Sequence, residues 1–308
     1  MEPPAFDPFS NKPDISQSSR KLYTFNLTKL NGGKPIKDLK FLSSPAVLNR
    51  INELKPNTRR TYLIAIVSSL KSRPERGYKK LYEKYYGEMM TLNKELKDNT
   101  EKTPKVKENW IEQSDVTAKL EQLKEILPEL VGKKKISAEQ YAKLLQLVVL
   151  SLYTLQQPRR NKDYTDMLIV RSNPADTSYN YLDIVGWNWI FNNYKTQKKY
   201  TQQILPVPAD LQSILTVYLK FHPQAKEIKN KKCTEQIHFL VQYDGTPIKT
   251  STEMTRMLNK IFGRKIGCSM LRSIFLTDKY GKASKELKED TNAMGTSVET
   301  AQSNYIKQ

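Results

Sequence analysis

The side chains of this 308-residue chain that best suit chemistry are basic ones and a tyrosine close to the C-terminus. They are Arg159, Arg160, Lys195, Arg272 and Tyr305. A guanidinium holds phosphate oxygens through forked hydrogen bonds and keeps its charge over the whole physiological pH range. Tyrosine is among the side chains that act as covalent nucleophiles. These residue types favour a substrate that contains phosphate.

The net charge supports the same class of partner. Lys and Arg number 51 against 32 Asp and Glu, which gives a formal charge of +19. A field of that sign attracts polyanions, so we favour a nucleic acid over a simple excess of lysine. Charge alone does not distinguish DNA from RNA.

Other sequence features narrow the setting. No apolar run is long enough to span a bilayer, and the N-terminus lacks the pattern of a signal peptide, so we expect no membrane partner. Cys233, Cys268, His222 and His238 form no metal-ligand spacing. We therefore expect an intracellular protein, in the nucleus or cytoplasm wherever its polyanionic partner lies, with no metal and no cofactor.

Composition divides the chain into four parts. Residues 1–42 read as a flexible N-terminal arm, and residues 43–97 as a helical domain. Residues 98–108 are polar, contain a proline and read as a linker. Residues 109–308 form a second domain.

The second domain mixes helices and short strands. Ser137 with Gln140 predicts a capping box before a strongly apolar helix. Period-two patterns predict four strands of a small antiparallel sheet, at 166–170, 179–185, 189–194 and 203–207. Further helices are expected at 116–130, 209–221, 252–262, 269–280, 284–290 and 297–303. The fold class predicted is mainly α with a small antiparallel β-sheet.

The candidate residues lie in four short segments. An arginine pair comes first, then a lysine between two strand-like runs, a second arginine and the tyrosine. The segments are Pro158–Asp163, Asn193–Lys199, Ser269–Phe275 and Met294–Tyr305. Each is a modest signal alone, whereas their order and separation together are informative.

In type and order these segments resemble the catalytic motifs of the tyrosine recombinases, the phage-type integrases. Residues 109–308 resemble the catalytic domain of that family and residues 43–97 its helical core-binding domain, so the resemblance covers most of the chain. Pro158-Arg159-Arg160 with Asp163-Tyr164 is similar to integrases of large DNA viruses and virophages. The implied fold is a helical core-binding domain followed by an α+β catalytic domain.

The resemblance implies site-specific DNA cleavage and rejoining, as in recombination or integration, through a 3′-phosphotyrosine intermediate. Tyr305 is then the nucleophile, and Arg160 with Arg272 holds the phosphate. Arg160 takes the family's arginine position because Asp163 follows it by three residues. Lys195 matches the lysine of a β-hairpin that protonates the leaving 5′-oxygen.

Further contacts with double-stranded DNA are expected around this centre. In the helical domain we expect them from Arg59 and Arg60, which begin a helix and form one half of a clamp. In the second domain the expected contacts are Arg159, Lys198, Lys199 and Ser273. The family acts as a tetramer, so self-association on DNA is also implied.

The chain departs from the family at its histidines. Ser269, Ser273 and Thr296 stand where the family has histidine. Serine and threonine hydrogen-bond phosphate but are poor acid–base groups, and loss of such a group typically costs about 10²–10⁴-fold in rate. We place Ser269 and Thr296 in the catalytic set and expect slow turnover.

Two alternatives remain open at this stage. One is a catalytically weak or inactive DNA-binding protein on the same fold, which adduct formation separates from a recombinase. The other is a basic RNA-binding or virion-packaging protein. Competition between duplex DNA and RNA separates that one.

Overall fold

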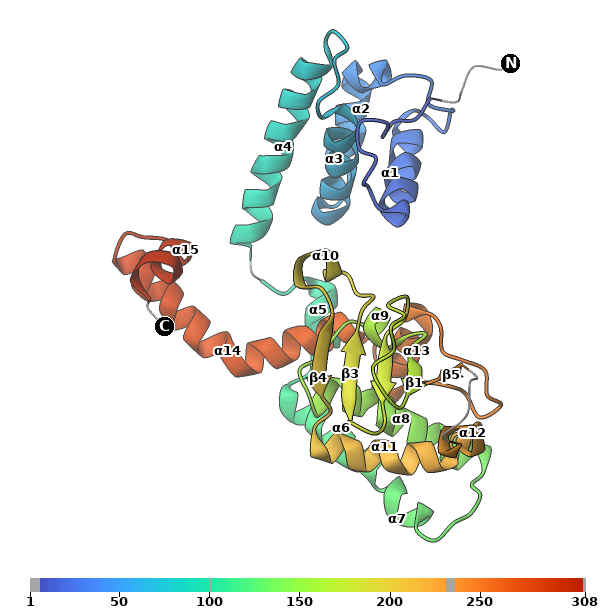
Figure 1. The fold of residues 1–308 in the computed structure, drawn as a ribbon. Coiled ribbons are helices and arrows are strands. Elements are labelled where there is room, and N and C mark those ends of the chain that lie inside the picture. Colours follow the sequence, from blue (N-terminus) through green and yellow to red (C-terminus); the bar gives the residue numbers. More distant parts are fainter. Residues whose placement is uncertain (1–5, 100, 231–235, 307–308) are drawn as a thin grey trace, which may run out of the picture. The chain divides into compact units, whose positions relative to one another are not determined.

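The computed structural model describes residues 6–99, 101–230 and 236–306, apart from the side chains of Asp98, Lys198 and Lys199. Contacts within the chain divide it after Lys102. We call Met1–Lys102 unit 1 and Thr103–Gln308 unit 2 (Figure 1). The division falls inside the predicted linker, although α5 (Pro104–Asn109) already begins there.

Unit 1 is helical. Proline occupies the first turn of α2 and α3, where its missing N–H costs nothing. Tyr85 of α4 is fully buried, and its hydroxyl donates to the Leu42 carbonyl oxygen at 2.8 Å. The elements of unit 1 are α1 (Gln17–Leu30), η1 (Lys40–Ser43), α2 (Pro45–Asn52), α3 (Pro56–Leu70) and α4 (Tyr78–Asp98).

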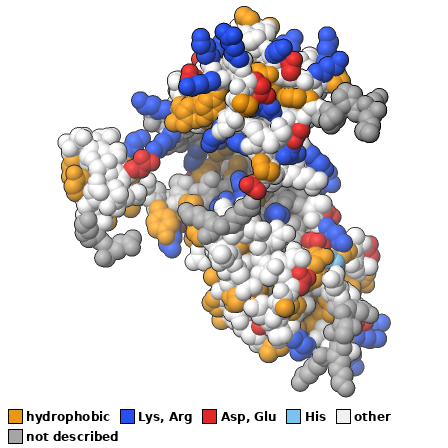
Figure 2. Space-filling view, turned by 45° about the horizontal axis from the view of Figure 1, so that its top comes forward, with side chains coloured by type: hydrophobic (Ala, Val, Ile, Leu, Met, Phe, Trp, Pro, Cys, Tyr) orange, Lys and Arg blue, Asp and Glu red, His pale blue; other side chains and the backbone are white. Residues whose placement is uncertain are grey.

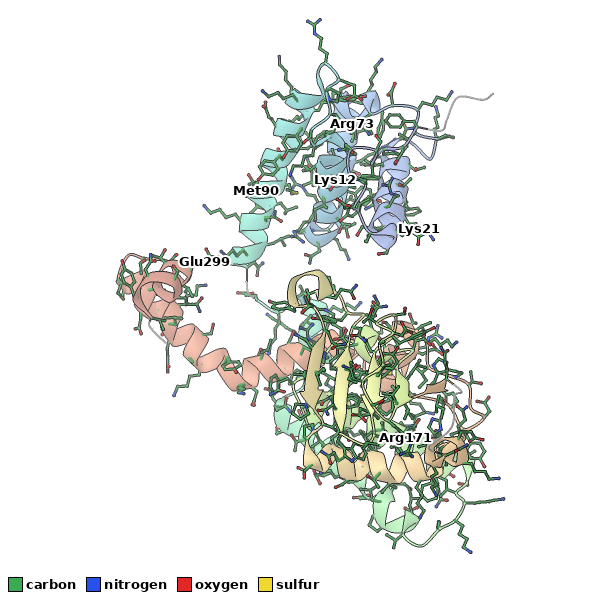
Figure 3. The ribbon with its side chains drawn as sticks, viewed as in Figure 1. Lys12, Lys21, Arg73, Met90, Arg171 and Glu299 are labelled. Carbon is green, nitrogen blue, oxygen red and sulfur yellow. The ribbon has the colours of Figure 1, made fainter. Side chains whose placement is uncertain are left out.

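The expectation of a flexible arm over residues 1–42 is wrong for the part of it that the structure describes. Residues 17–30 form α1, and Phe9 and Leu27 are fully buried in the unit 1 core. Arg73 (labelled in Figure 3) donates to the carbonyl oxygens of Asp7 and Pro8 at 3.1 and 3.0 Å. Composition suggested an arm because residues 1–20 are rich in Pro, Ser and Asn, yet several apolar residues of the described segment are buried in the core.

Helix α8 (Ala138–Thr154) is the centre of unit 2. The predicted capping box is confirmed: the Ser137 hydroxyl accepts from the Gln140 N–H at 3.1 Å, and the Gln140 side chain accepts from the Ser137 N–H. Residues 147–153 of α8 are all buried, because other helices and the sheet surround it. The helices of unit 2 that pack on α8 are α6 (Gln113–Lys124), α7 (Ile126–Leu130), α11 (Ala209–Phe221), α13 (Ser251–Phe262) and the start of α14 (Cys268–Ala293).

The sheet of unit 2 is mixed, so the prediction of an antiparallel sheet is wrong in one pair. Strand order is β4-β3-β2-β1-β5, and β1 pairs with β2 in parallel. A ten-residue connection (171–180) carries the chain back before β2 begins, and strands of three residues carry no signal of direction. The strands are β1 (Leu168–Val170), β2 (Tyr181–Asp183), β3 (Asn188–Phe191), β4 (Gln203–Pro206) and β5 (Ile237–His238).

Several predicted boundaries also change. The helix expected at 116–130 is divided into α6 and α7 at Glu125. The two helices expected at 269–280 and 284–290 are one continuous helix, α14. The two-residue strand β5 is too short to show a period and was not predicted.

The second half of α14 leaves the body of unit 2. Leu271 and Ile274 are buried, whereas residues 276–280 are exposed. Gly295, with φ of +66°, ends the helix in the left-handed region that favours glycine. Figure 1 shows the following α15 (Val298–Thr300) and the C-terminus at the far end of α14 from the sheet. No described helix is long and apolar enough to cross a membrane.

Buried His222 makes the stability of unit 2 depend on pH. Its Nδ1 accepts from the Gln224 N–H at 3.0 Å, so the proton lies on Nε2, which donates to the His238 carbonyl oxygen at 3.0 Å. Burial lowers the pKa of His222 from 6.5 to about 4. Between pH 6.5 and about 4, His222 is protonated in the unfolded chain and neutral in the folded chain.

We predict that acidification from pH 6.5 to about 4 lowers the free energy of unfolding, by up to roughly 3 kcal/mol from His222. Urea denaturation at several pH values measures it. The His222→Gln variant should lose this part of the pH slope, whatever its absolute stability. An unchanged slope would contradict the prediction.

Candidate phosphate-binding site between α9, α13 and α14

The short helix α9 (Asn161–Tyr164) is fixed in place by one buried amide. Asn161 donates to the Ser251 carbonyl oxygen at 2.9 Å and to the Thr255 hydroxyl at 3.0 Å, both on α13. It accepts from the Tyr153 hydroxyl of α8 at 2.7 Å. Asn161 is 3% exposed, and its bond with Tyr153 is fully buried. The residues next to it, Arg160 above all, are therefore held against α13.

The Arg159 side chain is held by contacts within the protein. Its Nε donates to Asp163 Oδ2 at 2.9 Å, and another guanidinium nitrogen donates to Gln203 of β4 at 2.9 Å. The guanidinium also lies over the Phe191 ring, with 3.8 Å to the ring centroid. The sequence pairs Asp163 with Arg160, whereas the structure pairs it with Arg159.

Burial raises the pKa of the Asp163 carboxyl, and the neighbouring Arg159 opposes that rise. The side chain is 3% exposed, and Oδ1 has no hydrogen-bond partner among the described residues. Arg159, which makes the ion pair, compensates the carboxylate most, and the charge and backbone N–H of Arg160 add to this.

The guanidinium of Arg160 is available to bind an anion. It occupies the N-cap position of α9 and is half-buried. Its side chain makes no hydrogen bond or ion pair with the residues that the structure describes. An unpaired, half-buried guanidinium is an anion site by its chemistry.

The first turns of α14 meet the same part of α13. A Cβ on Gly267 would lie 3.5 Å from Thr255 Cγ2, the residue that Asn161 also contacts. Burial is the main cause of the raised pKa of Tyr153. Charges on Cys268 and Asp163 raise this pKa further, so both residues lie near Tyr153. The segments that carry Arg160 and Arg272 thus converge on Thr255.

Arg272 is the second half-buried arginine of this region. It too makes no hydrogen bond or ion pair within the described part of the chain. The serines at the family's histidine positions are exposed, and the Ser273 hydroxyl donates to the Ser269 carbonyl oxygen at 3.0 Å. Both line a pocket of about 410 Å³ together with Thr255.

Lys195 lies in the connection between β3 and β4, which pair antiparallel from Asn188↔Pro206 to Phe191↔Gln203. The hairpin is therefore present where the sequence placed it. Lys195 is exposed and makes no ion pair with other described residues. The side chains of Lys198 and Lys199 lie outside the described set.

Tyr305 is not brought to this region within the chain. It ends a π-helical turn, η2 (Ala301–Tyr305), and is 62% exposed. Figure 1 places this end of the chain beyond the far end of α14, away from α9. Thr296 donates its N–H to the Thr291 carbonyl oxygen at 2.9 Å, so the Gly295–Thr296 segment closes α14 as a helix C-terminus.

The two arginines predicted to contact DNA in unit 1 are occupied by α4. Arg59 forms an ion pair with Glu88 at 2.8 Å, and Arg60 donates to Asn93 at 2.6 Å. They join α3 to α4, which weakens their assignment as DNA contacts. Other Lys and Arg side chains are spread over the visible face of unit 1, among hydrophobic and uncharged surface, at the top of Figure 2.

Sequence reasoning missed a basic row on α13. Arg256 and Lys260 are exposed and lie four residues apart, so they share one face of α13, and exposed Arg264 follows just after the C-cap Gly263. That spacing was visible in the sequence. Lys260 and Arg264 also line a shallow pocket with Lys265.

Comparison with known proteins identifies no relative: no family model, curated protein or solved structure matches the chain. Among the described residues, no group of three His, Cys, Asp or Glu side chains could hold a metal ion. The geometry above therefore carries the functional argument. It brings Asn161, next to Arg160, and Gly267, at the start of the helix that carries Arg272, to the same residue, Thr255, and it leaves the C-terminal segment apart.

The neighbouring arginines give a matched pair of variants. Arg159→Met should lower the free energy of unfolding by roughly 3–5 kcal/mol, because it leaves the buried Asp163 carboxylate unpaired. Arg160→Met should change it by less than about 0.5 kcal/mol and should weaken binding to duplex DNA instead. Urea denaturation and fluorescence anisotropy measure the two effects. Equal stability losses would contradict the assignment.

Proposed function

We propose that the protein cuts and rejoins DNA strands through a phosphotyrosine intermediate, as the resemblance to tyrosine recombinases implies. The observation that supports it most is the pair Arg160 and Arg272. Both are half-buried and unpaired among the described residues, and their segments meet at Thr255. Two guanidiniums facing one phosphate stabilise the charge that builds up during its substitution.

In this proposal the Tyr305 hydroxyl loses its proton to water as its oxygen attacks the phosphorus, and the bond to the 5′-oxygen breaks. A 3′-phosphotyrosyl ester forms, and the leaving 5′-oxygen takes a proton. Lys195, exposed on its hairpin connection, is the proposed donor. A 5′-hydroxyl then attacks the phosphotyrosyl ester, which rejoins the strand and releases the phenol.

The place of Tyr305 at the end of α14 adds a condition. Because it lies away from α9 in its own chain, we propose that it acts on the phosphate held by Arg160 and Arg272 of a second copy. Self-association on DNA is then required for cleavage. The exposed apolar side chains Leu276 and Tyr280 on α14 suit such a contact.

A second candidate is DNA binding without cleavage. Two observations favour it: Ser269, Ser273 and Thr296 cannot act as acid–base groups near neutral pH, and Tyr305 lies apart from the arginines. Adduct formation distinguishes the two candidates.

We predict that the protein forms a covalent adduct on a nicked duplex that carries its recognition site, and that Tyr305→Phe forms none. Denaturing gels of labelled DNA measure the adduct. If cleavage is in trans, a mixture of Tyr305→Phe with Arg272→Met restores adduct, because one copy supplies the phenol and the other the arginine.

Three outcomes are informative. A mixture as inactive as each variant alone contradicts cleavage in trans. Adduct yields that are the same for wild type and Tyr305→Phe contradict the nucleophile. DNA binding with no adduct on any nicked site supports the second candidate.

A further inference from the structure

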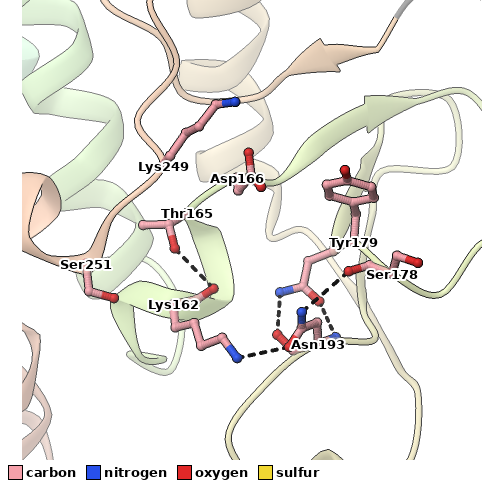
Figure 4. A pocket seen from close by; sticks show the side chains of 9 residues that line it. Lys162, Thr165, Asp166, Ser178, Tyr179, Asn193, Lys249 and Ser251 are labelled. Atoms are coloured by element: carbon pink, nitrogen blue, oxygen red, sulfur yellow. Dashed lines mark hydrogen bonds between the residues drawn. The ribbon is translucent and has the colours of Figure 1, made fainter. Parts of the chain in front are cut away.

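A second pocket, polar and lined in part by Lys162 of α9, is shown in Figure 4. Its volume is about 260 Å³. At roughly 30 Å³ per water molecule, that is more room than a single oxyanion needs. Besides α9, its walls come from residues 165–166 just after that helix, residues 178–180, Asn193 and the chain leading into α13.

Two lysines stand at opposite ends of this pocket (Figure 4). Lys162 Nζ donates to Asn193 Oδ1 at 3.0 Å, which leaves two of its three protons for another acceptor. Lys249 makes no hydrogen bond or ion pair with any residue that the structure describes. The hydroxyls of Thr165, Ser178 and Ser251 also line the pocket.

The pocket is built in advance by a buried amide. Asn180, 4% exposed, donates to the carbonyl oxygens of Asp163 and Asn193 at 2.9 and 3.0 Å. Its Oδ1 accepts from the backbone N–H groups of Asn192 and Asn193 at 2.8 and 2.7 Å. Because all four bonds are made, Asn193 and the Lys162 that it binds are held in position.

A carboxylate and an aromatic ring complete the wall. Asp166 has φ of +56°, a left-handed conformation that costs energy for a residue other than glycine, and its N–H donates to the Ile248 carbonyl oxygen at 3.2 Å. Its Oδ1 lies 3.3 Å from His238 Nδ1. Half-buried Tyr179 lies on the wall as well. A carboxylate repels a phosphate but accepts hydrogen bonds from a base or a sugar hydroxyl.

We propose that this pocket binds a phosphorylated nucleotide. The phosphate lies at the Lys162 end, which Figure 4 shows to be the end farther from Asp166, and the base or sugar donates to Asp166. Tyr179 supplies an aromatic surface for the base. The nucleotide is either free or a single unit of a DNA strand displaced from its stack. The DNA source rests on the proposed function, whereas the pocket does not.

Calorimetric titration of the full chain with thymidine 5′-monophosphate tests the proposal. Lys162→Gln should weaken binding at least about tenfold, since a charge-assisted bond to the phosphate is lost. Thymidine, which carries the base and sugar without the phosphate, is titrated as a second probe. Asp166→Asn should weaken the binding of thymidine. Lys226→Gln, an exposed lysine of α12 (Ala225–Lys229) outside the pocket, is the matched control and should bind like wild type.

The same variants are then titrated with a single-stranded oligonucleotide. A loss for both ligands in Lys162→Gln, but not in Lys226→Gln, supports the pocket with a DNA strand as the source. A loss for the monophosphate alone supports it with a free nucleotide. The nucleotide proposal is overturned if the monophosphate does not bind. It is also overturned if inorganic phosphate binds as tightly as the monophosphate. If the protein binds the monophosphate but forms no Tyr305 adduct, the strand-cleavage proposal is contradicted and the nucleotide-pocket proposal is supported.

Discussion

The buried side chain of Asn161 is the contact on which the candidate site depends. Three hydrogen bonds tie it to Tyr153 of α8 and to Ser251 and Thr255 of α13. An amide that is 3% exposed has no water to replace a lost partner, so the position of α9 is specified closely. It holds α9, with Arg160 at its N-cap and Lys162 on the polar pocket, against α13.

Around that anchor the two arginines of the pair have different roles, set by their partners. Arg159 compensates the buried Asp163 and packs on Phe191, so it holds the hairpin of β3 and β4 to α9. The Arg160 side chain makes no ion pair or hydrogen bond in the described chain, although its charge also lowers the pKa of Asp163, and its donors remain available to a ligand. A structural guanidinium beside a free one lets the protein keep positive charge at the surface without losing the geometry beneath it.

The sequence predicted much of this arrangement where the signal is local. The capping box at Ser137 and the β3–β4 hairpin that carries Lys195 are both present, because each depends on neighbouring residues. The parallel pairing of β1 with β2 and the packing of residues 6–42 depend on distant contacts, so no local pattern showed them. Spacing alone predicted that Asp163 pairs with Arg160. The observed partner is Arg159, because Gln203 and Phe191, distant in the sequence, hold its guanidinium in place.

The central claim is that Arg160 and Arg272 bind one and the same phosphate. A double-mutant cycle tests it: the affinity for duplex DNA is measured for Arg160→Met, Arg272→Met and the double variant, all in a Tyr305→Phe background. Two groups on one phosphate should be coupled, with the double loss differing from the sum of the single losses by more than about 0.5 kcal/mol. Losses that add within about 0.3 kcal/mol would contradict the claim, because they would show two independent contacts.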